Sequence, residues 1–239
     1  MGGDKPGLGD CLNLLTALIH SPLVGPFTWS MVADELRDRG MDVHVPDLAN
    51  PTKGPFWEQH ARSAAAQLGE IDADARIVLA GHSGSGVLLP AIARELECPI
   101  AAYLFVDAGL PRGGEPRMAG QFGQVLRDLY SRGERFPNWT DDALAGILPN
   151  AGVRARVLDE LRPQPWEFWQ EPLPEIAVWP DSPCAYLLFS SAYTDDTGTA
   201  ESLGWPLCRL SAGHFHLLVD PKAVAVAMLD LLDELGIQP

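Results

Sequence analysis

The stretch RIVLAGHSGSGVLL, residues 76–89, decides the fold. It begins with an apolar run of strand length, passes through a turn of glycine and serine, and continues into a segment that predicts a helix over residues 87–96. Ser83 stands at the apex of the turn, with Gly81 and Ser85 two residues before and after it. Small residues are needed there because a larger side chain would collide where strand and helix approach each other. The stretch therefore predicts a strand, a sharp turn that exposes a serine hydroxyl, and a helix.

A glycine-rich turn between a strand and a helix can also bind a phosphate group. The two patterns that mark such turns, Gly-x-x-x-x-Gly-Lys-Ser/Thr and Gly-x-Gly-x-x-Gly, are absent from the sequence. A histidine, His214, also follows an expected strand near the C-terminus, at a suitable place for a base that serves Ser83. These two observations favour a catalytic serine over a phosphate-binding turn.

Composition limits the class of protein and its partners. A chain of 239 residues with 46% hydrophobic residues is long enough for one domain with a large core. The formal net charge of −15 argues against nucleic acid and anionic membranes as partners, because both attract a basic surface. The expected partner is a small-molecule substrate.

The cysteines do not form a disulfide or zinc pattern. They are isolated in the sequence, at positions Cys11, Cys98, Cys184 and Cys208. Such spacing is typical of reduced thiols in a cytoplasmic protein, and no metal or organic cofactor is implied. The N-terminal residues show no signal-peptide pattern, and the apolar run over residues 12–19 is too short to span a membrane. We expect a cytoplasmic protein.

Apolar runs of strand length alternate with helical segments along most of the chain. Strands are expected over residues 11–19, 42–46, 77–80, 100–106, 184–190 and 206–210, and helices over residues 29–39, 55–68, 87–96 and 222–235. Residues 192–196 are expected to form a loop, with a short helix after it. The alternation predicts an α/β fold with a mostly parallel central sheet of about six strands, covered by helices on both faces.

Residues 111–180 differ from the rest of the chain. Strand signals are missing, and helical segments are expected over residues 119–130, 140–147 and 152–161. Tryptophans gather there among prolines, at positions Trp139, Trp166, Trp169 and Trp179. We interpret this segment as a helical lid, inserted after the strand that ends at Asp107 into a core of residues 1–110 and 181–239. Part of the tryptophans would line a pocket, with Trp139 and Trp166 as candidate substrate contacts, and the others would attach the helices to the core.

In an open parallel sheet, functional groups gather at the carboxyl ends of the strands. The candidates at this edge are Ser83, Asp107, Asp195 or Asp196, and His214, together with the loop that begins at His20. A serine hydroxyl needs a base that accepts its proton, and histidine has a suitable pKa. The histidine in turn needs a carboxylate that fixes its tautomer.

Three groups of residues occur together in this chain: Gly81-His82-Ser83-Gly84-Ser85, Gly213-His214 with Pro221 seven residues after the histidine, and His20, Gly25 and Trp29 followed by Val45-Pro46-Asp47-Leu48. Together they resemble the α/β-hydrolase superfamily over almost the whole chain. The short start before His20 resembles the compact branch of methylesterases and hydroxynitrile lyases. The resemblance implies Ser83 as the nucleophile and His214 as the base. We expect His82 to pack beside the nucleophile and His216 to have a structural role.

The acid of the triad stays open between two aspartates. In most of the superfamily it follows the strand after the lid, which points to Asp195, with Asp196 next to it. Two adjacent carboxylates in a turn can instead cap a helix. Asp107 ends a buried strand, where an unpaired carboxylate would be costly, and some relatives take their acid from this strand.

The resemblance also implies an oxyanion hole, and here the sequence departs from the family pattern. One donor is the backbone N–H after the nucleophile, here Gly84, and the second comes from the loop after the first strand. Ser21 replaces the usual glycine of that loop, and Pro22 occupies the donor position without an N–H. Leu23 would donate if the loop shifts by one residue.

Three functions remain open. The first is a serine hydrolase that acts on an ester, thioester or lactone of a small, largely apolar molecule. The second is a lyase or cyclase in which Ser83 and His214 transfer protons without a complete oxyanion hole, and Pro22 favours it. The third is a ligand-binding protein with an inactive site, against which the intact serine and histidine argue.

Overall fold

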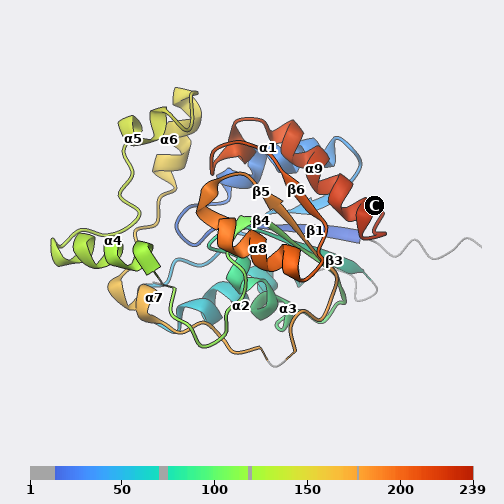
Figure 1. Ribbon diagram of the computed structural model, residues 1–239, viewed down its shortest axis with the longest axis horizontal. Coiled ribbons are helices and arrows are strands. Elements are labelled where there is room, and N and C mark those ends of the chain that lie inside the picture. The colour runs from blue at the N-terminus through green and yellow to red at the C-terminus, as the bar shows by residue number, and fades with distance from the viewer. Residues whose placement is uncertain (1–13, 70–74, 118–119, 177, 239) are drawn as a thin grey trace, which may run out of the picture.

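The computed structural model describes residues 14–69, 75–117, 120–176 and 178–238. Its centre is a six-stranded sheet of order β2-β1-β3-β4-β5-β6, in which every paired strand is parallel to its neighbour (Figure 1). The strands are β1 (Leu14–Ile19), β2 (Asp42–His44), β3 (Arg76–Ser83), β4 (Ile100–Ala108), β5 (Cys184–Leu188) and β6 (Leu207–Arg209). The prediction of an α/β fold with about six mostly parallel strands is confirmed.

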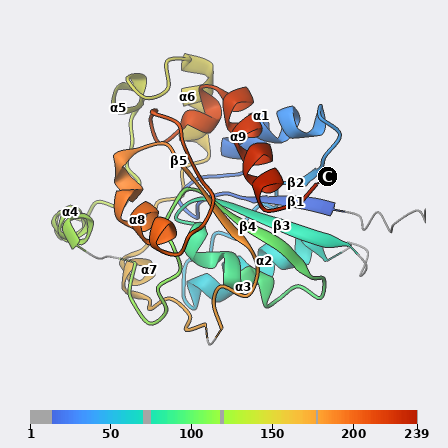
Figure 2. The ribbon, with the colours of Figure 1, turned by 45° about the vertical axis from the view of Figure 1, so that its right-hand side comes forward.

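Helices cover both faces of the sheet, as Figure 2 shows. One face packs against α1 (Phe27–Arg37) and α9 (Pro221–Glu234), and the other against α2 (Phe56–Leu68) and α3 (Leu89–Ala93). Two separate apolar cores result, one on each side of the sheet, and they contain Trp29 and Met228 on one side and Tyr103 and Tyr186 on the other. Strands buried from both sides must be apolar along their length, which is why β1 and β4 read as continuous hydrophobic runs.

In the part of the segment between β4 and β5 that the structure describes, there are four helices: α4 (Gly120–Ser131), α5 (Asp141–Ala145), α6 (Ala151–Asp159) and α7 (Trp166–Gln170). Figure 1 shows α4, α5 and α6 to one side of the sheet. Val153 and Val157 of α6 join the core beside α1, so this part of the segment is attached to the main body. A short antiparallel bridge pairs Pro116 with Pro172, near the two ends of the segment.

Two local predictions need correction. Residues 87–96 form a 3-10 turn, η1 (Gly86–Leu88), followed by the short helix α3, because Pro90 near the start of α3 cannot donate a hydrogen bond to the preceding turn. The expected loop over residues 192–196 is a second 3-10 turn, η2 (Ser191–Tyr193), followed by α8 (Thr194–Ser202). Asp195 and Asp196 lie in the first turn of α8, where the helix dipole favours negative charge.

A third 3-10 turn, η3 (His216–Leu218), precedes α9. Residues 11–13 of the expected first strand, Cys11, and residue 119 of the expected lid helix lie outside the described residues. Within the described ranges, no helix combines the length and the apolar character needed to cross a lipid bilayer.

Candidate active site

Ser83 ends strand β3 in a left-handed backbone conformation, with φ of 60°. A non-glycine residue adopts this conformation at a cost in energy, and in this sharp turn Ser83 lines the cavity at the end of the strand. A Cβ atom at Gly86 would lie 2.3 Å from the carbonyl oxygen of Gly109, so this position requires glycine. The hydroxyl of Ser85 donates to the carbonyl of Ile19 over 2.7 Å, so a serine fits where the family pattern has glycine.

His214 lies in the loop between β6 and η3 and faces the serine. Its Nε2 is 3.0 Å from the Oγ of Ser83, and its Nδ1 is 2.6 Å from the Oδ2 of Asp107. The carboxylate accepts the Nδ1 proton, so Nε2 is free to accept the proton of Ser83. Because the three side chains come from the ends of β3 and β4 and from the loop after β6, the parallel sheet brings them together.

Asp107 is fully buried near the end of β4 and has a φ of 44°. Its Oδ1 accepts the backbone N–H groups of Phe189 and Ser190, both over 2.9 Å, and its Oδ2 accepts the hydroxyl of Ser190 over 2.7 Å. Burial acts to raise the pKa of this carboxyl, but the hydrogen bonds from His214 and Ser190 and the charge of His214 outweigh it and lower the pKa below its ordinary value. Asp107 therefore remains ionised beside His214.

The two aspartates after β5 have different surroundings. Asp195 is exposed in the first turn of α8. Within the described residues, the carboxylate that forms a hydrogen bond with His214 is that of Asp107, not that of Asp195. Asp196 accepts the backbone N–H of Leu110 over 2.9 Å and pairs with Arg112 over 3.1 Å. Asp196 thus links α8 to the chain that leaves β4.

His82 packs against the catalytic candidates. Its ring stacks on His214, with centroids 4.6 Å apart, and its Nε2 lies 3.0 Å from the carbonyl oxygen of His214. Burial, followed by the charge of His214, lowers the pKa of His82 to about 3, so its ring is neutral and donates from Nε2. His82 holds the backbone and the ring of His214 in place.

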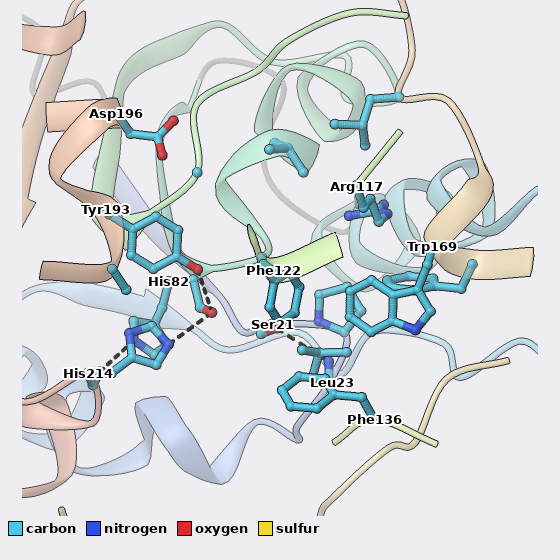
Figure 3. A pocket seen from close by; sticks show the side chains of 18 of the residues that line it. Ser21, Leu23, His82, Arg117, Phe122, Phe136, Trp169, Tyr193, Asp196 and His214 are labelled. Carbon is cyan, nitrogen blue, oxygen red and sulfur yellow. Dashed lines mark hydrogen bonds between the residues drawn. The ribbon is translucent and has the colours of Figure 1, made fainter. Parts of the chain in front are cut away.

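Tyr193 of η2 is a site residue that sequence reasoning missed. Its hydroxyl lies 3.1 Å from the Oγ of Ser83, and its ring lies 5.6 Å from that of His214 (Figure 3). Burial raises the pKa of Tyr193 to about 12, against the opposite effect of the hydrogen bond to Ser83, so the phenol is protonated. When Ser83 donates to His214, Tyr193 donates to Ser83. The sequence signal for Tyr193 is its place shortly after strand β5.

The loop after β1 forms the wall beside Gly84. A Cβ atom built on Gly84 would lie 3.2 Å from the Oγ of Ser21, so the Ser21 hydroxyl lies beside Gly84. The N–H of Leu23 points to the same hydroxyl, over 3.4 Å, and Pro22 has no N–H.

His20 fixes the start of that loop. Its Nε2 accepts the N–H of Leu48 over 3.0 Å, and its Nδ1 lies 2.9 Å from the carbonyl oxygen of Ser21 and donates to it. The Oδ1 of Asp47 is 3.4 Å from the same Nε2, but a nitrogen that accepts from Leu48 carries no proton for that carboxylate. Through these hydrogen bonds, His20 links the end of β1 to the loop after β2.

A cavity of about 610 Å³ opens above Ser83. Its apolar wall includes Pro22, Leu23, Val87, Phe122, Phe136, Trp139, Phe168 and Trp169, and its polar lining includes Ser21, Ser83, Tyr193 and His214. Trp139 lines the cavity as expected. Trp166 is not among the lining residues and packs against Tyr130, with ring centroids 5.1 Å apart, while Trp169 takes the place at the cavity. Among the described residues, no group of three His, Cys, Asp or Glu side chains could hold a metal ion.

Comparison with known proteins identifies the family. Residues 17–227 match the model of the alpha/beta hydrolase family. The chain belongs to this family. The resemblance inferred from the three groups of residues is confirmed. No curated protein matches the chain in sequence.

Similar solved structures show the same α/β-hydrolase fold at low sequence identity. An extracellular α/β-hydrolase from a Paenibacillus species is 19% identical, with a TM-score of 0.72 over 91% of this chain and 98% of that one. A methylesterase from Arabidopsis is 16% identical, with a TM-score of 0.68 over 92% and 99%. Tomato Methylketone Synthase I, in a complex with β-ketoheptanoate, is 11% identical, with a TM-score of 0.67 over 94% and 99%.

Proposed function

We propose that this α/β hydrolase is a serine hydrolase that cleaves an ester, thioester or lactone of a small, largely apolar molecule. The observation that carries the proposal is the chain of hydrogen bonds from Ser83 through His214 to Asp107, with distances of 3.0 and 2.6 Å. A histidine oriented by a buried carboxylate is the arrangement that activates a serine hydroxyl. The apolar cavity above Ser83 supports a largely apolar substrate.

In the first half of the reaction, Ser83 Oγ attacks the carbonyl carbon while its proton moves to Nε2 of His214. The carboxylate of Asp107 stabilises the imidazolium that forms. The carbonyl oxygen becomes negative near the N–H of Gly84, and the hydroxyl of Ser21 is the adjacent donor. The imidazolium then donates its proton to the leaving alcohol or thiol, and an acyl-enzyme remains. Water, with His214 again as the base, releases the acid and restores Ser83.

We propose that residues 111–180 form a lid over this site. The segment supplies much of the cavity wall, including Phe122, Phe136, Trp139 and Trp169. A wall of aromatic side chains from an inserted segment would select the substrate and exclude water from the acyl-enzyme.

A second candidate function is a non-hydrolytic lyase or cyclase reaction. It is favoured by Pro22, which removes one backbone donor of the oxyanion hole, and by the N–H of Leu23, which already points to Ser21. In that case Ser83, His214 and the hydroxyl of Tyr193 would transfer protons without an acyl-enzyme. The fold accommodates this alternative, since one structural neighbour is named a methylketone synthase.

The test is labelling with a fluorophosphonate probe, followed by intact mass measurement and peptide mapping. A stoichiometric adduct on Ser83 that is lost in Ser83→Ala and strongly slowed in His214→Ala is the expected result. A folded sample that gives no adduct would contradict the hydrolase proposal. Turnover of elimination or cyclisation substrates would then distinguish the second candidate from a binding protein with an inactive site.

A further inference from the structure

The guanidinium of Arg117 faces the same cavity as Ser83 and has no role in the proposed reaction. Its Nε and Nη2 atoms are shielded from solvent, and no atom of the described residues forms a hydrogen bond with them. Figure 3 shows Arg117 beside Trp169, across the pocket from Tyr193 and His214. A second polar site therefore exists in a mostly apolar cavity.

Arg117 keeps its charge in this position. Its Cζ lies 4.5 Å from the ring centroid of Phe168, in the geometry of a cation–π contact. Burial lowers the pKa of Arg117 to about 10, and the charge of Glu171 acts in the opposite direction. The guanidinium is therefore a cation at neutral pH, and a buried cation without an anionic partner is unfavourable.

The neighbouring carboxylates are engaged elsewhere. Glu171 accepts the N–H groups of Phe56 and Trp57 at the start of α2, over 2.6 and 3.0 Å. Asp196 pairs with Arg112 at the cavity. Glu115 lines the cavity but is exposed, and within the described residues it forms no hydrogen bond with the Nε or Nη2 of the guanidinium.

We propose that Arg117 binds a carboxylate of the substrate. A guanidinium presents paired N–H donors that match a carboxylate, and a single arginine neutralises a single negative charge. The apolar side chains of Leu23 and Phe122 line the same cavity as Arg117 and the catalytic side chains (Figure 3). The substrate class is then a small ester, thioester or lactone with a free carboxylate, separated from the reacting carbonyl by an apolar chain.

This inference rests on the proposed function, because it takes the cavity above Ser83 as the substrate site. Its test measures binding alone and does not depend on the reactivity of Ser83. Isothermal titration calorimetry would measure the binding of straight-chain carboxylates, from butanoate to decanoate, and of the primary amides of equal length. The proteins compared are the wild type, Arg117→Gln, Arg117→Met and Arg112→Gln. The last variant removes a cavity arginine whose charge Asp196 already neutralises, so it is the matched control.

The expected result is that the best carboxylate binds the wild type about 10- to 100-fold more tightly than its amide, the range for a hydrogen bond to a charged group. This preference should fall to about 1 in both Arg117 variants and persist in Arg112→Gln. Thermal unfolding checks that each variant is folded. Arg117→Met replaces the guanidinium with a flexible, unbranched apolar side chain that can still pack on Phe168, so it separates loss of charge from loss of packing.

Three outcomes would overturn the proposal. The first is equal binding of carboxylates and amides, or no binding of either, by the wild type. The second is a carboxylate preference that survives Arg117→Met. The third is tighter binding of octylphosphonate than of octanoate, which would indicate a phosphoryl group as the ligand. Any of these combined with a normal fluorophosphonate adduct on Ser83 would leave the hydrolase proposal intact.

Discussion

The loop after β1 has no backbone N–H at Pro22, and the neighbouring hydroxyl of Ser21 is the candidate donor in its place. The Ser21 Oγ lies beside Gly84, and Pro22 has no N–H, so the oxyanion of the proposed reaction would have one backbone donor and one side-chain donor. We expect Ser21→Ala to lower kcat and kcat/KM for p-nitrophenyl butanoate by about 100- to 1000-fold, since this donor acts in the transition state. Steady-state kinetics over a range of substrate concentrations would measure both constants.

Tyr193→Phe is the matched variant, because it also removes one hydroxyl from the neighbourhood of Ser83. Tyr193 donates to the nucleophile and is a positioning residue, so its loss should cost about 3- to 10-fold, the range for a neutral hydrogen bond. A Ser21→Ala enzyme within threefold of the wild type would contradict the role of Ser21. A larger loss in Tyr193→Phe than in Ser21→Ala would transfer the donor role to Tyr193.

The carboxyl end of strand β4 determines which aspartate serves His214. Asp107 is buried, ionised and 2.6 Å from Nδ1 of His214, whereas Asp195 lies exposed on α8. We expect Asp107→Asn to lower kcat/KM by about three to four orders of magnitude, because the amide favours the wrong tautomer of the histidine. Asp195→Asn should stay within twofold of the wild type. Equal, mild effects of the two substitutions on p-nitrophenyl butanoate hydrolysis would contradict the triad.

The order of the elements and the approximate positions of the strands could be predicted from the sequence, because parallel strands buried on both faces must be apolar. The choice between Asp107 and Asp195 could not. It depends on the φ of 44° at Asp107, on the three hydrogen bonds that Phe189 and Ser190 give its carboxylate, and on the start of α8 at Thr194. These features follow from tertiary packing after β5.

The helices α4, α5 and α6 between β4 and β5 were predicted with approximately correct bounds, but α7 was not, nor were the side chains that this segment presents to the cavity. Trp139 and Trp169 line it, and Trp166 packs against Tyr130, although all three lie in the same aromatic-rich segment. Arg117 and Tyr193 belong to no motif, so no sequence pattern could mark them. Their importance comes from burial and from neighbours that are distant in sequence.

The stability of the whole molecule should depend on pH through two buried histidines. Burial is the main cause that lowers the pKa of both His60 and His82 from 6.5 to about 3, so the folded protein holds them neutral. The unfolded chain binds a proton at each of them below about pH 6.5. The unfolded state thus binds more protons between about pH 6.5 and 3, and the free energy of unfolding must fall as the pH falls through this window. Asp107 and Asp47, whose pKa values in the folded protein lie below the ordinary 3.8, add to this fall below about pH 5.

Between about pH 7.5 and pH 5.0, each buried histidine should remove up to about 2 kcal/mol from the free energy of unfolding. Urea unfolding followed by tryptophan fluorescence at both pH values would measure this loss. His60→Gln removes one of the two groups and keeps a donor for the carbonyl of Ala49, so the loss with pH should shrink by about half. His44→Gln, at an exposed position, is the control and should leave the loss unchanged. An unfolding free energy that is constant over this range would show that the two histidines bind protons in the folded protein as they do in the unfolded chain. The ring of His82 would then be charged at pH 5.0, and it could not support His214 as a neutral stacking partner.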